Sequence, residues 1–161
     1  TIKEGDVLVG YVSDGPHANG WSLIRRVLAQ NPDLFSKEEI VSLLAPTRLY
    51  HDVVKDVKDA GVTPKAYAHI TGGGLPENLE RLFQGLGADL EIPYWDNAPM
   101  RKLFDFVDAD DKFHTFNMGI GWVCIVSPED VDKVLSAGDG GHVIGKVVSE
   151  EGVRVTEKPA G

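Results

Sequence analysis

The segment Ala66-Tyr67-Ala68-His69-Ile70-Thr71-Gly72-Gly73-Gly74-Leu75-Pro76-Glu77-Asn78 decides the fold class, because it joins a strand directly to a helix. Residues 66–70 are mostly apolar and aromatic, which is typical of a buried strand. Pro76 favours the first turn of a helix because it has no N–H to leave unpaired, and Glu77 suits the positive end of the helix dipole. A strand followed at once by a helix predicts an α/β domain, with helices packed on a sheet.

The same alternation of strands and helices continues on both sides of this segment. Residues 6–12 form an apolar run that predicts a strand, and residues 20–30 carry apolar side chains at helical spacing. No internal repeat or linker interrupts the pattern. We therefore predict one domain over residues 1–161, of mixed α/β (α+β) class. The other expected helices are a short one with Ser36 and Glu39 as its capping box, one closed by Gly61, one at 98–107 and one at 128–136 that is capped by Ser127. The other expected strands are at 88–92, 121–126 and 143–148. A short strand at 152–155 is expected as a partner of 143–148.

The overall composition excludes several classes of partner. The formal net charge is −9, and binding to nucleic acid requires clustered lysine and arginine, so we expect no nucleic-acid partner. No apolar run approaches the roughly 18 residues of a membrane span, so we expect no membrane partner. Cys124 is the single cysteine, which excludes a disulfide within the chain and fits a reducing compartment. We therefore expect a cytoplasmic location.

The three consecutive glycines at 72–74 are the strongest sign of a binding site. Each glycine loses extra backbone entropy on folding, and a tight turn alone would require only one. Three glycines ahead of a helix let backbone N–H groups approach an anion closely. Thr71, Gly72, Gly73 and Gly74 are therefore candidate substrate-binding residues. The alternative is a flexible turn without a ligand.

Two more glycine-bracketed segments are weaker candidates. In Ser13-Asp14-Gly15-Pro16-His17-Ala18-Asn19-Gly20, the histidine and asparagine can donate and accept hydrogen bonds, although Asn19 would also serve as a plain helix cap. In Phe116-Asn117-Met118-Gly119-Ile120-Gly121, Asn117 is a plausible ligand contact, although a glycine-rich bend also explains the pattern. The spacing of the remaining histidines predicts no metal site. A dinucleotide fingerprint at Gly72-x-Gly74 fails because Glu77 stands where a third glycine is needed.

Four segments resemble, in order and at similar spacing, the carboxy-terminal domain of the aminoimidazole ribonucleotide synthetase family. The resemblance extends over roughly residues 5–148. The segments are Gly5 to Gly10 with Gly15 to Leu23, Leu43-Leu44-Ala45-Pro46-Thr47-Arg48-Leu49-Tyr50, His69 to Gly74, and Phe116 to Gly121.

The resemblance implies an ATP-dependent cyclo-ligase of purine biosynthesis, which converts formylglycinamidine ribonucleotide to aminoimidazole ribonucleotide. Members of this family have two α/β domains and form homodimers, and the amino-terminal domain carries most of the ATP and magnesium site. Only the second domain is expected here, because the resemblance to it extends over nearly the whole chain. The chain opens at Thr1 without an initiator methionine, as expected of an excised piece or a processed start. The isolated chain is therefore expected to be inactive. The alternative is a non-catalytic ligand-binding or dimerisation module of the same superfamily.

The resemblance also implies which residues face the substrate cleft. His17, Asn19 and Gly20 are expected there, as are His69, Thr71 and the glycines at 72–74, with Asn117 as a further candidate. Either His17 or His69 could move a proton during catalysis, because imidazole titrates near neutral pH. Ala18 stands where many relatives carry a serine, so a hydrogen bond from that position is not expected.

Overall fold

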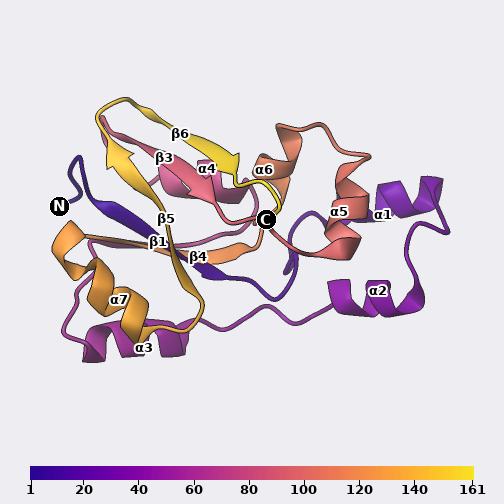
Figure 1. Ribbon diagram of the computed structural model, residues 1–161. Coiled ribbons are helices and arrows are strands. Elements are labelled where there is room, and N and C mark those ends of the chain that lie inside the picture. Colours follow the sequence, from indigo (N-terminus) through magenta and orange to yellow (C-terminus); the bar gives the residue numbers. More distant parts are fainter.

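A computed structural model describes residues 1–161 and confirms the predicted mixed sheet with helices packed on it (Figure 1). The sheet has six strands in the order β2-β4-β1-β5-β3-β6. Neighbouring strands are antiparallel, except that β3 and β6 are parallel. The strands are β1 (Val7–Val12), β2 (Ala66–His69), β3 (Gly87–Ile92), β4 (Ile120–Val126), β5 (Gly141–Val148) and β6 (Gly152–Glu157).

Helices cover the sheet on both faces, because successive side chains of its strands point in opposite directions. On β1, Leu8 belongs to the larger apolar core, whereas Val9 and Tyr11 belong to the smaller one. The larger core is covered by α1 (Trp21–Gln30), α2 (Lys37–Leu43), α4 (Gly74–Glu80) and α5 (Ala98–Phe104), and the smaller core by α3 (His51–Asp59) and α7 (Val131–Ala137). Two short helices, α6 (Asp111–Thr115) and the 3₁₀ turn η1 (Pro128–Asp130), complete the chain.

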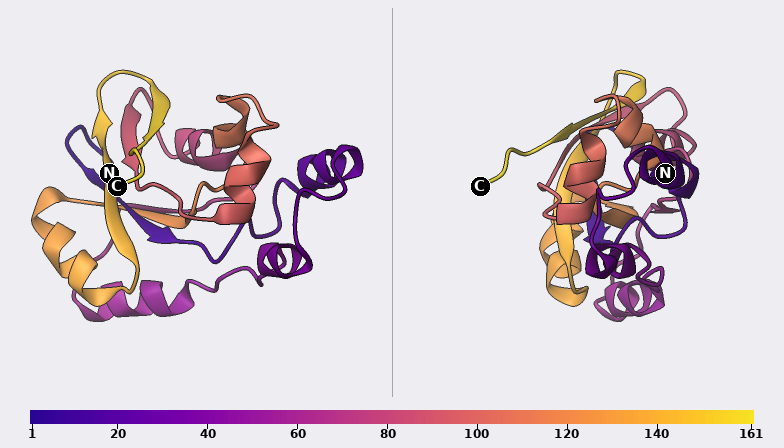
Figure 2. Two further views of the ribbon diagram at one scale, coloured as in Figure 1. Left: turned by 45° about the vertical axis from the view of Figure 1, so that its right-hand side comes forward. Right: turned by 90° about the vertical axis from the view of Figure 1, so that its right-hand side faces the viewer.

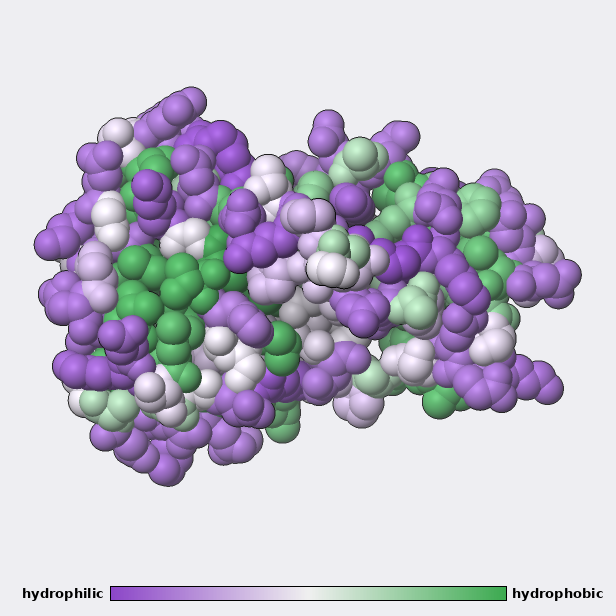
Figure 3. Space-filling model, in the orientation of Figure 1, coloured by the Kyte–Doolittle hydropathy of each residue, from purple (hydrophilic) through white to green (hydrophobic).

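The helices are unevenly distributed over the sheet. In Figures 1 and 2, α1 and α2 lie together at one end of the molecule, and α3 and α7 lie at the other. The C-terminal tail projects from the body in the right-hand view of Figure 2. On the half of the sheet formed by β3 and β6, one face carries the ion pairs Asp89–Arg154 and Glu91–Lys158, so this face is solvated. Figure 3 shows an apolar area on the half of the molecule that holds β5 and α7, and Val143 of β5 is 46% exposed.

Several local expectations are confirmed. The capping box is present at α2, since Ser36 accepts from the Glu39 amide and the Glu39 carboxylate accepts from the Ser36 amide. Gly61 has a φ of +80°, as expected for a residue that closes a helix. Cys124 is buried in the smaller core.

Two local expectations are wrong. The Ser127 side chain caps no helix, because the chain enters α7 through the 3₁₀ turn η1. The strand at 152–155 extends to Glu157 and pairs in parallel with β3, not with the strand at 143–148 that precedes it. Both errors concern the path of the chain between elements, which local residue preference does not determine. The helix α6 was also not expected.

None of the helices is both long and apolar enough to span a membrane.

Candidate functional site

Three loops meet at one end of the sheet, and they contain most of the residues singled out from the sequence; His69 ends β2 and Gly74 begins α4 on either side of one of these loops. The strands β1 and β2 both run antiparallel to β4, so the ends of β1 and β2 lie beside the start of β4. Residues 13–20 follow β1, residues 70–73 follow β2, and residues 116–119 precede β4. Sheet topology therefore brings together three segments that are far apart in sequence.

Asn117 braces two of these loops. Its side-chain amide donates to the Gly15 carbonyl at 2.9 Å. Its carbonyl accepts from the Ser13 hydroxyl at 3.1 Å and from the Gly119 amide at 2.8 Å. Asn117 is 2% exposed, so these internal bonds account for its position. A direct substrate contact by Asn117 stays a prediction, and this geometry does not favour it.

Asn78 braces the glycine loop in a similar way, although the sequence did not single it out as a functional residue. Its side-chain amide donates to the carbonyls of Thr71, Gly72 and Gly74, and its carbonyl accepts from the Thr71 hydroxyl. With these carbonyls turned toward Asn78, the amides of Gly72 and Gly73 have no acceptor within the chain. The loop thus presents two free N–H donors.

The three glycines serve three different purposes. Gly74 is a close-packing residue, because an added Cβ would lie 1.9 Å from the Phe113 carbonyl oxygen. Gly73 has a φ of +91° and forms the N-cap of α4, and its Cβ would meet the Glu77 side chain. Gly72 is exposed and has only Asn19 nearby, at 3.8 Å from an added Cβ. Gly72 is therefore the glycine open to a ligand.

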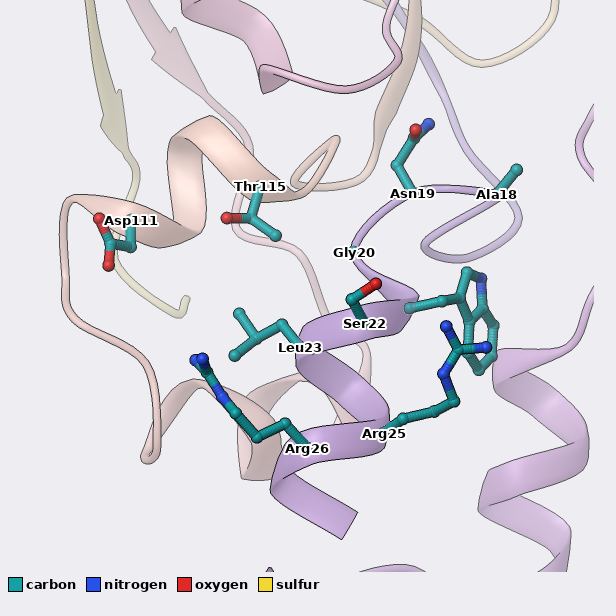
Figure 4. Close-up of a pocket in the computed structure, with 10 residues that line it drawn as sticks. Ala18, Asn19, Gly20, Ser22, Leu23, Arg25, Arg26, Asp111 and Thr115 are labelled. Carbon is teal, nitrogen blue, oxygen red and sulfur yellow. The ribbon is translucent and has the colours of Figure 1, made fainter. Parts of the chain in front are cut away.

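The start of α1 lies against this loop. The N-cap of α1 is Gly20, with a φ of +81° and no side-chain cap, so the alternative role of Asn19 as a helix cap is wrong. A side chain at Gly20 would collide with the Phe116 ring, which makes this glycine necessary for packing. An open hollow of about 890 Å³ adjoins the start of α1, and Figure 4 shows Arg25 and Arg26 of α1 on one side and α6 on the other. Its lining includes Asn19, Ser22, Arg25, Arg26, Asp111 and Thr115.

His17 is buried in an unusual backbone conformation, with a φ of +57° and 5% exposure. Its Nε2 accepts from the Asp14 amide at 3.3 Å and from the Arg48 amide at 3.4 Å. Because both partners are donors, the proton of the neutral ring is on Nδ1, which is buried without a partner. Burial lowers the pKa of His17, and nearby His69 and Arg48 lower it further, against the opposing effect of Asp14.

His69 has a different environment. It is exposed, and its ring lies 6.0 Å from the Trp122 ring and 6.2 Å from the Tyr50 ring. Tyr50 and Trp122 are stacked, with ring centres 5.7 Å apart and an interplanar angle of 18°. These side chains line a hollow of about 480 Å³, which we name the ring recess; its walls include Arg48, Leu49, Tyr50, Val54, His69 and Trp122.

The ring recess was not predicted from the sequence. Tyr50 and Trp122 are separated by 72 positions in the chain, and neither belongs to a recognisable polar motif. Gly121 makes their arrangement possible, because a side chain there would collide with the Tyr50 hydroxyl and the His17 ring. No group of three or more His, Cys, Asp or Glu side chains lies together in an arrangement that could hold a metal ion.

Comparison with known proteins now gives the family. Residues 3–158 match the model of "AIR synthase related protein, C-terminal domain". The chain belongs to this family. AIR synthase relatives named phosphoribosylformylglycinamidine cyclo-ligase include a protein of Agathobacter rectalis, 42% identical over an alignment that covers 93% of this chain and 48% of the relative. A chloroplastic protein of Arabidopsis thaliana with the same name is 39% identical, with 94% and 43% covered.

Solved structures with other names share the fold of this chain. E. coli HypE matches with a TM-score of 0.63 and 20% identity, covering 96% of this chain and 47% of the other. T. maritima PurL complexed with FGAR matches with a TM-score of 0.54 and 14% identity, covering 98% and 26%. These matches concern the fold alone. The chain spans about half the length of the curated relatives that it matches.

Proposed function

We propose that this chain is the carboxy-terminal domain of a phosphoribosylformylglycinamidine cyclo-ligase. Joined to an amino-terminal domain, it would use ATP to close the imidazole ring of formylglycinamidine ribonucleotide, giving aminoimidazole ribonucleotide. The main support is the 42% identity to a protein of that name along nearly the whole chain. The convergence of three glycine-bracketed loops at one end of the sheet supports a binding site in the same region.

The ribose phosphate of the substrate would bind where the glycine loop meets the start of α1. The free amides of Gly72 and Gly73 are suitable donors, and hydrogen bonds to a charged group contribute about 1.5–3 kcal/mol each. The ten-residue helix α1 begins beside them and adds the positive end of its dipole. Glu77 is exposed, but its carboxylate lies close to Gly73. Phosphate would therefore approach from the Gly72 side.

The two histidines would have different roles. His17 is held neutral, with its Nε2 occupied by two amide donors, so it acts in our proposal as a fixed hydrogen-bond donor. His69 is exposed at the ring recess and has a free path to a ligand. Of the two candidates for proton transfer, we therefore propose His69.

ATP would activate the formyl oxygen of the substrate by phosphorylation, after which the amine attacks the activated carbon and phosphate leaves. The residues of this chain would hold the ribonucleotide during these steps and keep its reacting atoms aligned. They offer no acidic cluster that could hold magnesium. The ATP and magnesium sites, the homodimer and a cytoplasmic location belong to the proposal for the assembled enzyme.

The test is reconstitution. The chain would be fused behind the amino-terminal half of the Agathobacter rectalis relative, and formation of ADP and aminoimidazole ribonucleotide would be followed with magnesium, ATP and formylglycinamidine ribonucleotide. We expect turnover by the fusion and none by the 161-residue chain alone. A folded fusion without ADP or product formation would favour the non-catalytic module, and turnover by the isolated chain would refute the need for a second domain.

A further inference from the structure

The ring recess combines features of a site for a flat ligand. Two of its walls are the stacked rings of Tyr50 and Trp122, and a third is the exposed ring of His69. At its rim Leu49 is 75% exposed, which is unusual for so large an apolar side chain. Planar ligands favour such surroundings, because every heteroaromatic base has a π-face that stacks on aromatic side chains.

The walls of the recess are fixed before any ligand binds. The Tyr50 hydroxyl donates to the Val12 carbonyl at 2.8 Å. The Arg48 guanidinium donates to the carbonyls of Val12 and Asp139, both at 3.1 Å. His69 and Trp122 are paired across β2 and β4 in the sheet. A preformed site loses less conformational entropy on binding than a flexible one does.

The recess also lies at a suitable distance from the glycine loop. His69 lines the recess, and Gly72 follows three residues later. Extended chain rises about 3.3 Å per residue, so the backbone of Gly72 lies at most about 10 Å from that of His69, whose side chain lines the recess. A single ribonucleotide, whose sugar separates its phosphate from its ring, can reach both.

We propose that the ring recess binds the planar, nitrogen-rich end of the ribonucleotide, with Trp122 as the stacking surface, while the glycine loop binds the phosphate. This inference rests on the proposed function for the identity of the ligand. Trp122 is thereby a specificity-determining residue: it favours ribonucleotides whose base end is flat over sugar phosphates without a ring.

The experiment compares two probes on the 161-residue chain. Aminoimidazole ribonucleoside carries the ring without the phosphate, and ribose 5-phosphate carries the phosphate without the ring. Trp122→Leu removes the stacking surface, whereas Trp122→Phe keeps a ring. Tyr67→Leu is the matched control, because Tyr67 packs on Trp122 and does not line the recess. Circular dichroism and thermal melts would confirm that each variant folds.

We expect Trp122→Leu to bind the nucleoside about tenfold more weakly or worse, in line with the usual contribution of base stacking. Trp122→Phe should retain most of the affinity but lose the quenching of tryptophan fluorescence that the nucleoside causes. Tyr67→Leu should bind as the wild type does, and ribose 5-phosphate should bind all variants equally. Unchanged nucleoside affinity in a folded Trp122→Leu, or no nucleoside binding by the wild type, would overturn the proposal.

The reconstituted fusion separates this proposal from the proposed function. If the fusion turns over and Trp122→Leu leaves the KM for formylglycinamidine ribonucleotide unchanged, the recess proposal fails and the cyclo-ligase function stands. If the fusion is inactive but the nucleoside still binds through Trp122, the recess stands as a ring site and the cyclo-ligase function fails.

Discussion

The glycine loop at 71–74 and the loop at 13–20 are both held by a buried asparagine, but the two braces differ in range. Asn78 holds its loop across 4 to 7 positions of the chain. Asn117 holds Ser13 and Gly15 across 104 and 102 positions. The first loop is therefore shaped by its own helix, whereas the second depends on the completed sheet. The brace of loop 71–74 thus forms within one local segment, whereas the brace of loop 13–20 forms only when the tertiary structure is complete.

The largest effect should come from the glycine that packs most closely in the local loop. Gly74→Ala places a Cβ 1.9 Å from the Phe113 carbonyl, at a φ of +61° that alanine rarely adopts. We expect a loss of about 3 kcal/mol in unfolding free energy or no folding at all, since backbone must move to relieve the contact. Urea unfolding curves would measure it.

Gly72→Ala is the matched control for this change. An added Cβ there meets only Asn19, at 3.8 Å, so stability should change by less than about 0.5 kcal/mol.

Gly72→Val should also fold, but it should bind ribose 5-phosphate on the order of a hundredfold more weakly if phosphate approaches this residue. Equal stability of Gly74→Ala and Gly72→Ala would refute the division of roles among the glycines.

A smaller effect should come from the two braces. Asn78→Ala and Asn117→Ala each leave several polar groups of the loops without their partners, and we expect each to cost about 2 kcal/mol. Hydrogen exchange would distinguish them. Asn78→Ala should raise exchange only within residues 71–80, whereas Asn117→Ala should raise it in both residues 13–20 and residues 116–119. A purely local response to Asn117→Ala would contradict the long-range role of this brace.

The smallest effect should be the pH dependence of stability due to His17. Its pKa is lowered in the folded chain, so the unfolded chain binds the proton more tightly. The contribution of neutral His17 to the free energy of unfolding is present above the ordinary histidine pKa of about 6.5. It is lost as the pH falls through the pKa of His17 in the folded chain. Between about pH 7.5 and about pH 5.5, the wild type should therefore lose more stability than His17→Gln. Exposed His142→Gln is the control, and identical pH profiles for the wild type and His17→Gln would contradict the prediction.

The range of each brace also explains how much of the site could be predicted from the sequence. The glycine loop was recognised from adjacent residues, because a strand, three glycines and a proline in a helix turn are all local signals. Asn78 lies within the same segment, and an asparagine one turn into the following helix is a local signal of such a brace. By contrast, nothing near Tyr50 or Trp122 in the sequence indicates that their rings stack.

The sequence by itself determined the fold class, most helices and strands, the acidic surface and the location of the glycine loops. These features depend on apolar spacing, caps and turn residues within a few positions of one another. Tertiary structure decided the parallel pairing of β6 with β3, the buried state of His17, the exposure of His69 and the formation of the ring recess. The physical reason is that pairing partners, burial and ring contacts arise from the closed sheet, whose neighbouring strands are distant in sequence.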